Sequence, residues 1–365
     1  MLARTRVLSY VVAVLVAGVA CSAAAQDDGW INLFDKETLF GWTPIGDAEW
    51  KVSDGNLVCL KGSGGWIATT SQFADFELVV RIKVTADGST GVVFRGGLEG
   101  SPSENGSSVV LITTPEKTKP EWREVRITAE GANVSATVDG QPAELLSGSR
   151  PCGYIGIQFH RTGKVDVAEA KLRLLNMKPI FNGENLDGWN ILPDHASKFA
   201  VVDGAINITD GNGQIETVGL YKNFVLQLDI ISNGDALNSG VFYRGPVGVF
   251  WKGYESQVRN QWLKDDRTRP VDFGTGGNYG NQAARKVVST DREWFTKTIV
   301  CDGNHAAIWI NGYLASDFLD VRPVSAESNG KEGYVTGPGT IHLQGHDPTT
   351  DLSFKNIRIQ EYPAN

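Results

Sequence analysis

Residues 30–42 read WINLFDKETLFGW, and residues 177–189 read MKPIFNGENLDGW. Both stretches place Asp or Asn after a phenylalanine and end in Leu-x-Gly-Trp at the same spacing. The likeness continues downstream, since residues 89–96 read STGVVFRG and residues 238–245 read NSGVFYRG. Self-similarity that stays in step over most of two halves indicates a tandem duplication. We place its seam near Met177.

Each copy alternates apolar and polar residues with a period of two. The stretch 77–84 reads ELVVRIKV and the stretch 226–230 reads LQLDI, a pattern typical of strands with one face on a core. Asp-Gly, Asn-Gly and Gly-Gly turns separate such stretches, and no long segment has helical spacing. The sequence therefore predicts an all-β chain of two tandem β-sandwich or jelly-roll domains, at residues 26–177 and 178–365.

The first 25 residues have the layout of a secretory signal. Arg4 and Arg6 precede an apolar run at residues 7–20, and three alanines at 23–25 precede a polar stretch. We expect cleavage after Ala25 and a secreted or periplasmic protein. Lipid attachment at Cys21 is the alternative, although residues 18–20 lack the usual large aliphatic side chain. No apolar run approaches the ~20 residues that a membrane helix needs.

Charge and cysteine content exclude some classes of function. The chain has 34 basic and 42 acidic residues; removing residues 1–25 removes two arginines and leaves 32 against 42, a net charge of −10. This balance argues against a nucleic-acid partner. The three remaining cysteines, Cys59, Cys152 and Cys301, are an odd number, so we expect no disulfide framework. A bridge between Cys59 and Cys152 stays open.

The second copy carries polar and aromatic residues that the first copy lacks. They lie between Arg244 and Trp294, a segment far longer than its counterpart between Arg95 and Trp122. The extra segment holds Trp251, Tyr254, Glu255, Gln257, Arg259, Asn260, Trp262, Asp265, Asp266, Arg267, Tyr279 and Arg285. The first copy has only Ser107–Ile112, which reads SSVVLI, at this point.

Side chains two apart on a strand share a face, and three polar ladders follow from this rule: Asn238 with Arg244; Glu255 with Gln257 and Arg259; His342 with Gln344 and His346. Any solvated sheet face shows such alternation. Gln, His, Asn and Arg beside Trp are, however, the donors, acceptors and stacking surfaces that sugars need. We predict a concave sugar-binding face in copy two and a degenerate site in copy one, which serves as a scaffold, a lid or a weak binding module.

Copy two also contains a set of motifs at characteristic spacing: Phe181-Asn182-Gly183, Asn238-Ser239-Gly240 with Arg244, Gly253-Tyr254-Glu255-Ser256-Gln257, Thr275-Gly276-Gly277-Asn278-Tyr279-Gly280, Leu343-Gln344-Gly345-His346 and Phe354-Lys355-Asn356-Ile357-Arg358. Together they resemble the 3-keto-disaccharide hydrolase domain family. The resemblance implies a concanavalin A-like sandwich that cleaves glycosides whose sugar carries a ketone at C3.

The chemistry implied by this resemblance is proton removal at C2 followed by loss of the C1 substituent and addition of water. It requires a base and donors to an enolate oxygen. We expect Glu255 or His346 to be the catalytic base, with Arg244, Gln257 and Gln344 holding the ketone and nearby hydroxyls. The remaining substrate-binding candidates are Asn238, Tyr254, Arg259, Tyr279, His342 and Trp251.

Several alternatives stay open. His342 and His346 with Glu255 are candidates to hold a divalent cation, although no metal or other cofactor is indicated with certainty. The chain has no Glu-x-Asp-x-x-Glu strand for ordinary retaining hydrolysis. A lectin-like protein that binds glycans without cleaving them, or a laminin-G-like adhesion module, would use the same sandwich. The expected partner is an oligosaccharide or glycoside, and the oligomeric state is left open.

Overall fold

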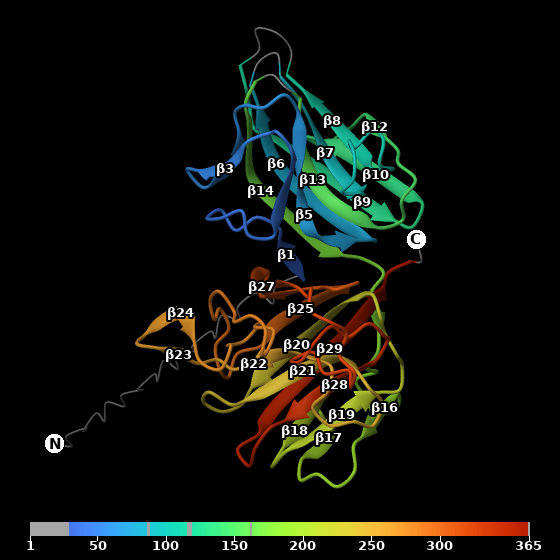
Figure 1. Cartoon of the computed structure of the whole chain (residues 1–365), viewed down its shortest axis with the longest axis vertical. Helices are drawn as coiled ribbons and strands as arrows, with labels where there is room; N and C mark the ends of the chain where they lie inside the picture. Colours follow the sequence, from blue (N-terminus) through green and yellow to red (C-terminus); the bar gives the residue numbers. More distant parts are fainter. Residues whose placement is uncertain (1–28, 86–87, 115–118, 161–162, 364–365) are drawn as a thin grey trace, which may run out of the picture.

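The computed structural model describes residues 29–85, 88–114, 119–160 and 163–363, and within these ranges the chain is all strand, turn and loop. Two β-sandwiches follow one another, and Figure 1 shows them stacked along the long axis of the molecule. We call them repeat one and repeat two. The predicted signal at residues 1–25, including Cys21, lies outside the described residues. No helix long and apolar enough to cross a membrane occurs in the described part of the chain.

Repeat one consists of two antiparallel sheets. The first sheet contains β1 (Trp30–Asn32), β3 (Trp50–Ser53), β4 (Asn56–Cys59), β6 (Phe76–Val84), β9 (Arg123–Glu130), β10 (Asn133–Val138), β11 (Gln141–Pro142) and β14 (Val165–Leu174). The second contains β2 (Trp42–Gly46), β5 (Gly65–Phe73), β7 (Ser89–Gly96), β8 (Ser108–Thr113), β12 (Leu145–Leu146) and β13 (Gly153–Phe159). Their orders are β11-β10-β9-β6-β14-β4-β3, with β1 on β14, and β12-β8-β7-β13-β5-β2.

Repeat two has the same plan. One sheet contains β15 (Lys178–Pro179), β17 (Lys198–Val202), β18 (Ala205–Thr209), β20 (Phe224–Ser232), β25 (Phe295–Asp302), β26 (His305–Ile310), β27 (Tyr313–Leu319) and β29 (Asp351–Glu361). The other contains β16 (Trp189–Ile191), β19 (Gly213–Thr217), β21 (Ser239–Gly245), β22 (Tyr254–Val258) and β28 (Thr340–Gly345). Their orders are β17-β18-β29-β20-β25-β26-β27, with β15 on β29, and β16-β19-β28-β21-β22. A separate hairpin joins β23 (Trp262–Leu263) to β24 (Asp266–Pro270).

The alternation of period two places the core as predicted. In β6, Leu78, Val80 and Ile82 are fully buried between the sheets of repeat one, whereas Glu77 and Arg81 face outward and are less buried. Burying one face of each strand removes apolar area from water at about 25 cal/mol per Å². Each repeat has its own large hydrophobic core, so both are folded sandwiches.

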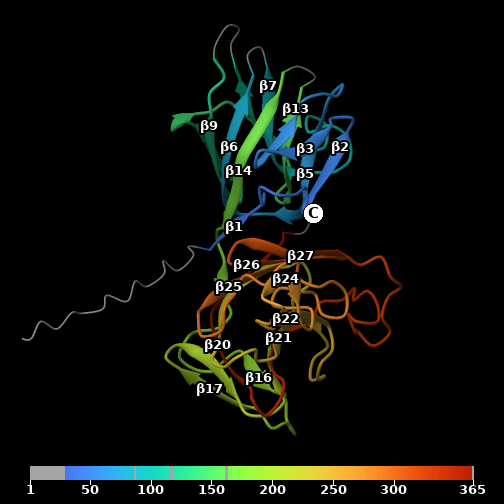
Figure 2. The ribbon, with the colours of Figure 1, turned by 90° about the vertical axis from the view of Figure 1, so that its left-hand side faces the viewer.

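The two repeats pack directly on each other. Val300 of β25, Trp309 of β26 and Leu314 of β27 belong to the same apolar cluster as the core of repeat one. The Trp309 indole Nε1 donates to the carbonyl of Asn32 at 3.1 Å, and Thr70 Oγ1 donates to Asp317 Oδ2 at 2.9 Å. Figure 2 shows β27 lying along this junction. Repeat two therefore presents one face of its β20, β25, β26 and β27 strands to repeat one.

The cysteines and the surface charge complete the outline. Cys59, Cys152 and Cys301 are buried free thiols, so the Cys59–Cys152 bridge that the sequence left open is not formed. Burial raises the pKa of the Cys59 thiol to about 11, which keeps it protonated and unreactive.

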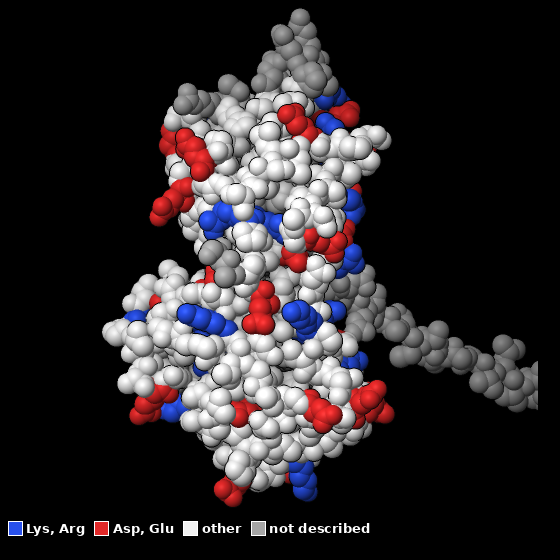
Figure 3. Space-filling model, turned by 90° about the vertical axis from the view of Figure 1, so that its right-hand side faces the viewer, with Lys and Arg blue, Asp and Glu red and all other residues white. Residues whose placement is uncertain are grey.

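On the face shown in Figure 3, basic side chains form small groups separated by acidic and uncharged ones.

Candidate active site

Two rows of side chains cross the β19-β28-β21-β22 sheet of repeat two on its outer face. In the first row, Glu216 lies opposite His342, His342 opposite Phe242, and Phe242 opposite Glu255. Two residues further along the strands, Gln214 lies opposite Gln344, and Gly240 lies opposite Gln257. The register of four strands thus gathers polar residues from three separate sequence stretches, on β19, β22 and β28, into one polar patch. We call Gln214, Glu216, Glu255, Gln257, His342 and Gln344 the polar face.

The polar face is buried although it lies outside the hydrophobic core. His342 is 0 % exposed and Glu255 is 4 % exposed. Loops reach over the sheet and contact these side chains: the Gly248 N–H donates to both carboxylate oxygens of Glu216 at 3.1 Å, and the Trp251 N–H donates to Gln214 Oε1 at 2.8 Å. Burying this many polar groups is expensive unless each one is hydrogen-bonded.

Several atoms of this region have no hydrogen-bond partner in the structure. They are His342 Nδ1, Gln214 Nε2, Gln344 Oε1 and, beside the face, Asn238 Oδ1. An unsatisfied buried donor or acceptor costs about 1–3 kcal/mol. Donors and acceptors left together in this way are complementary to the hydroxyl and carbonyl groups of a polar ligand.

Repeat one shows that the fold does not require these polar groups. Its strands pair in the same register: Trp66 is opposite Gln158, Ala68 opposite Gly156, Val93 opposite Val109, and Gly91 opposite Leu111. In repeat one, Trp66 therefore replaces Gln214, Ala68 replaces Glu216, and Gly156 replaces His342. Val109 replaces Glu255, and Leu111 replaces Gln257. Only Gln344 has a matching residue, Gln158. Most of these residues join a small apolar cluster. A sandwich of this plan is thus stable with an apolar face. The fold of repeat two therefore does not need its polar face for stability.

Glu255 has an unusual electrostatic environment. Burial raises its pKa to about 7, against the lowering effect of Lys331, whose Nζ lies 3.2 Å from Glu255 Oε2. Gly240 makes room for this carboxylate, because a Cβ at that position would lie 2.5 Å from Glu255 Oε1. On the core side of the strand, the buried Lys297 Nζ donates to the carbonyls of Ser256 and Gln257 at 2.9 Å. The strand that carries Glu255 is therefore held rigidly.

Glu216 and His342 form an ion pair that the sequence analysis did not identify. His342 Nε2 lies 3.1 Å from Glu216 Oε2. Burial alone would raise the pKa of Glu216, but hydrogen bonds from His342 and from the Gly248 N–H lower it below its usual range. Glu216 thus stays ionised and orients the imidazole. The alternation of Gln214 and Glu216 on β19 was the available signal, and copy one has Trp66 and Ala68 there.

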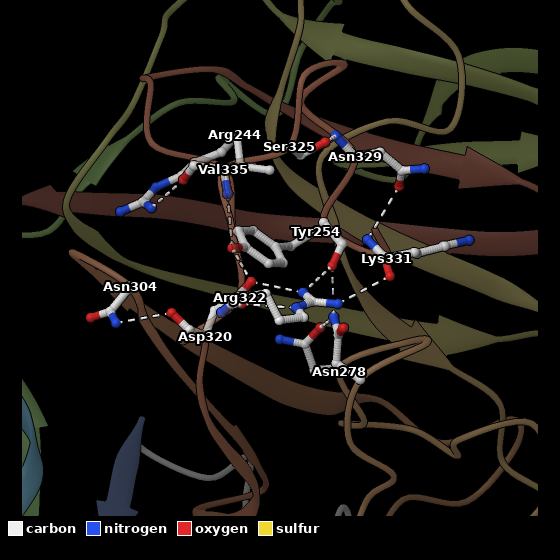
Figure 4. A network of polar contacts seen from close by, with 12 residues as sticks. Arg244, Tyr254, Asn278, Asn304, Asp320, Arg322, Ser325, Asn329, Lys331 and Val335 are labelled. Carbon is white, nitrogen blue, oxygen red and sulfur yellow. Dashed lines mark hydrogen bonds and ion pairs between the residues drawn. The ribbon is translucent and has the colours of Figure 1, made fainter. Parts of the chain in front are cut away.

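Lys331 lies in the loop between β27 and β28, and a network of polar contacts holds this loop in place, as Figure 4 shows. Arg322 donates to the carbonyls of Lys331 at 3.0 Å and Gly330 at 2.7 Å, and to Asp320 Oδ2 at 2.7 Å. Asp320 Oδ2 also accepts from the Tyr254 hydroxyl at 2.8 Å. Lys331 Nζ in turn lies 4.1 Å from the Tyr279 ring centroid. The network anchors the loop, so Lys331 stays close to Glu255.

Tyr254 lies on the opposite side of the sheet from the polar face. Its hydroxyl bonds to Asp320 and accepts from the Val335 N–H, and its ring stacks on the buried Tyr243 at 5.4 Å. Burial raises the pKa of the Tyr254 hydroxyl. The expected contact of Tyr254 with a ligand on the polar face is therefore wrong, because alternation directs Tyr254 inward where it directs Glu255 outward.

The predicted ladder of Asn238 with Arg244 is also wrong. Arg244 has a φ of 52°, and the register shifts between Phe242 and Gly245, so alternation fails there. Its guanidinium donates to the carbonyls of Lys222, Gly303 and Val335 and to Asn223 Oδ1. Arg95 does the same in repeat one, with a φ of 51° and bonds to the carbonyls of Ala74 and Gly131 and to Asp75. The shared arginine is a structural clamp of the repeat.

The other predicted residues surround the polar face. Asn238 Nδ2 donates to Asp272 Oδ2 at 3.1 Å, the same carboxylate oxygen that accepts from Gln257 Nε2 at 3.0 Å. The Tyr279 N–H donates to the carbonyl of Glu255 at 2.8 Å. The Arg259 guanidinium donates to Gln261 Oε1 and does not contact the side chains of the polar face through these bonds.

A row of stacked rings lies at the rim. His195 stacks on Phe250, Phe250 on Trp251, and Trp251 on His346, with centroid distances of 4.0, 4.7 and 5.6 Å. The Trp251 ring thus stacks on two neighbouring rings and remains 37% exposed at the rim. His346 lies at the end of this row and pairs with Asp347 at 3.1 Å, so it does not share the interior of the polar face with Glu255.

The three side chains considered for a cation do not converge. His342 Nε2 is engaged by Glu216 and Thr340, and His346 is at the rim. In the part of the chain that the structure describes, no group of three or more His, Cys, Asp or Glu side chains is arranged to hold a metal ion. The sequence-based cation site at His342, His346 and Glu255 is therefore not assembled by these residues.

The fold and the register together define a tandem concanavalin A-like sandwich protein with one polar face. The chain belongs to the family of 3-keto-alpha-glucoside-1,2-lyase-like domains, which it matches twice, at residues 29–173 and 176–360. The resemblance inferred from the motifs of copy two is thereby confirmed, and the two matched segments are consistent with a tandem arrangement.

Individual relatives are more distant. A 3-keto-disaccharide hydrolase of Bacteroides thetaiotaomicron is 29% identical over 107 residues, which are 24% of this chain and 36% of the relative. The match therefore spans about a third of that relative's length. A Parabacteroides distasonis structure, provisionally assigned as a glycosyl hydrolase, is 23% identical with a TM-score of 0.42 and covers 51% of this chain and 94% of its own. The carbohydrate-binding module CBM66 of Bacillus subtilis is 16% identical with a TM-score of 0.30, over 36% and 94%.

Proposed function

We propose that repeat two cleaves 3-keto-glycosides by elimination and hydration on the polar face, with Glu255 as the base. The observation that carries this proposal is the contrast between the repeats. Repeat two buries Glu216, Glu255 and His342 with unpartnered polar atoms beside them, whereas repeat one fills the same places with apolar residues. Family membership supplies the substrate class.

The reaction begins at C2, whose proton is acidified by the neighbouring C3 ketone. A carboxylate with a pKa of about 7 is largely ionised just above neutral pH and is more basic than an ordinary glutamate, so Glu255 is suited to remove that proton. The electron pair moves to the C3 oxygen and forms an enolate. The Lys331 ammonium lies next to Glu255 and stabilises this negative charge.

The second half of the reaction restores the sugar. The enolate collapses, the C1–O bond breaks, and the departing oxygen takes a proton, for which we assign His342 as the donor because its imidazole lies in the polar face and is oriented by Glu216 at 3.1 Å. A C1=C2 double bond conjugated to the ketone remains. Water adds at C1 and gives its proton to His342, and C2 recovers a proton from Glu255. The net change is addition of one water molecule across the glycosidic bond.

Ordinary two-carboxylate hydrolysis fits the site less well. Glu216 and Glu255 do share a row, but three strand spacings of ~4.8 Å put their Cα atoms roughly 14 Å apart, with His342 and Phe242 between them. Retaining glycosidases place their carboxyl groups ~5 Å apart and inverting ones up to ~9.5 Å. The spacing thus supports a mechanism with one base.

The test is to incubate residues 26–365 with 3-keto-trehalose and with trehalose and to follow 3-keto-glucose by mass. We expect release from the ketone alone, and loss of release in Glu255→Gln. Glu332→Gln, an exposed glutamate next to Lys331, is the matched control and should retain activity. No release from a panel of 3-keto-glycosides, with glycan binding intact, would instead favour the lectin-like function.

We also propose that this activity is exported. The support is the signal layout of residues 1–25, which lie outside the described part of the chain. Fractionation of cells that make the whole chain should recover the protein, shortened by the signal, outside the cytoplasm; recovery of the unprocessed chain in the cytoplasm would contradict this.

A further inference from the structure

One loop of repeat two completes the site beside Glu255. We call residues 271–285 the site loop. It pairs with β22 along its length: the Gln257 N–H donates to the carbonyl of Gly277 at 2.9 Å, the Gly276 N–H to that of Gln257 at 3.0 Å, and the Tyr279 N–H to that of Glu255 at 2.8 Å. Its Asp272 carboxylate accepts from Gln257 at 3.0 Å. Displacement of the site loop would therefore disturb both Glu255 and Gln257.

The far side of the site loop rests on β27. Ser316 Oγ donates to the carbonyl of Gly276 at 2.7 Å, and the Asp317 N–H donates to Gln282 Oε1 at 2.7 Å. A Cβ at Gly276 would lie 2.7 Å from the Ala315 Cβ, so the backbone of the loop lies directly against the strand. Since β27 also packs on repeat one through Leu314, the strand lies between repeat one and the site loop.

The end of the site loop reaches repeat one directly through Arg285. Its Nη2 donates to Asp35 Oδ2 at 2.9 Å and to Thr38 Oγ1 at 3.1 Å, and its guanidinium lies 4.4 Å from the Phe40 ring centroid. The Asp35 side chain is 7% exposed. Burial raises its pKa, but hydrogen bonds from Thr38 and Arg285 more than offset this and lower the pKa below its usual value. Asp35 is therefore ionised and paired.

Repeat two shows which of these features the turn itself needs. By the alignment of the two opening stretches, Asp35 corresponds to Asn182 and Phe40 to Asp187. Asn182 Oδ1 accepts from the N–H groups of residues 184 and 185, as Asp35 Oδ1 accepts from those of residues 37 and 38. An amide thus suffices for the turn. The carboxylate and the aromatic ring in repeat one are additional, and both contact Arg285.

We infer that repeat one acts as a buttress for the site of repeat two, with Asp35 as a positioning residue that works through Arg285. The effect on the site loop follows from these contacts alone, whereas the effect on catalysis rests on the proposed function. Repeat one, whose own face is apolar, thereby has a role in the reaction without touching the substrate.

The direct test is amide hydrogen exchange of residues 273–281 in the 26–365 protein. Asp35→Asn keeps the turn, as Asn182 does, and removes the charge. We expect exchange in these residues to rise about tenfold, the size of a coupling of ~1.4 kcal/mol between contacting residues. Arg285→Gln should have the same effect, and the double variant should add nothing further. Gln72→Leu is the control, because it removes another contact between the repeats, the hydrogen bond from Gln72 to Asp302, which does not involve the site loop. Unchanged exchange in Asp35→Asn overturns the inference.

Activity supplies a second readout that a purely structural contact would not alter. Burial is the main cause of the raised pKa of Glu255, so a loosened site loop should move the midpoint of the kcat/KM profile for 3-keto-trehalose to lower pH in Asp35→Asn and not in Gln72→Leu. An unmoved midpoint, with exchange increased, contradicts the catalytic part of the inference. If the unmodified protein cleaves no 3-keto-glycoside but exchange responds as expected, the proposed function fails and the buttress stands.

Discussion

At the scale of single residues, Glu255 couples folding to pH. Its folded pKa of about 7 exceeds the usual value for glutamate, so the folded state binds this proton more tightly than the unfolded state. Stability from this group is complete below the unfolded pKa and is lost as pH rises through the folded pKa. The ionised base that catalysis needs is therefore obtained at the expense of stability.

Replacing Glu255 with Gln should stabilise the protein at high pH. A shift of roughly 2.5 pKa units corresponds to about 3 kcal/mol, so Glu255→Gln should gain up to this amount relative to the unmodified protein between pH 5 and pH 8. Urea unfolding at the two pH values measures it, with Glu332→Gln as the exposed control. An equal difference at both pH values would show that Glu255 titrates normally.

Lys331 should set the pH at which the base works. Because Lys331 lowers the pKa of Glu255, Lys331→Met should shift the midpoint of the kcat/KM profile upward from about 7 by roughly one pH unit, a discounted value since Lys331 is partly exposed. The profile should rise with pH, as expected for a base. Lys264→Met on the β23-β24 turn is the control, and a midpoint that moves equally in both variants would contradict the role of Lys331.

At the scale of strands, Gly240 makes room for the base. A Cβ there would lie 2.5 Å from Glu255 Oε1, and a Cβ at its counterpart Gly91 would lie 2.6 Å from Val109 Cγ1. Overpacking in Gly240→Ala and Gly91→Ala should lower the free energy of unfolding by about 1–3 kcal/mol. Both variants should therefore have a lower melting temperature. Only Gly240→Ala should lose activity, by tenfold or more. Equal activity of the two variants would argue that Glu255 is not the base.

The arginine clamps should matter for stability rather than for binding. Arg244 and Arg95 are buried and each donates to two or more backbone carbonyls, so Arg244→Met and Arg95→Met should each destabilise the fold by about 3 kcal/mol or more. Thermal unfolding of the two variants measures this. An Arg244→Met protein with normal melting temperature and a raised KM would restore the substrate-binding role predicted from the sequence.

At the scale of the whole molecule, the duplication and the all-β class could be predicted from the sequence, because repeated motifs and period-two alternation are local signals. The site could be predicted only in part. Alternation correctly brought Glu255 and Gln257 to one face, but it failed at Arg244, where a positive φ and a register shift reverse the side chain. Glu216 and Lys331 reach the site through strand order and loop packing, which no local pattern reports.

Comparison of the repeats also explains why one chain carries two sandwiches. Repeat one keeps the clamp and the sheet register but replaces the polar face with Trp66, Val109 and Leu111, and it directs Asp35 and Phe40 toward the site loop of its neighbour. Under the proposed function, the whole protein is one site on two sandwiches. On this basis neither half alone should be fully active, since the contacts of Arg285 cross the junction.

The most direct test of elimination is to carry out the cleavage of 3-keto-trehalose in deuterium oxide and to locate deuterium in the 3-keto-glucose released. Exchange of the Glu255 carboxyl proton with solvent before its return predicts deuterium at C2 in product formed early in the reaction, before authentic 3-keto-glucose in the same buffer exchanges by itself, and no product with Glu255→Gln. Product released at an undiminished rate by Glu255→Gln would contradict the role of Glu255 as the base.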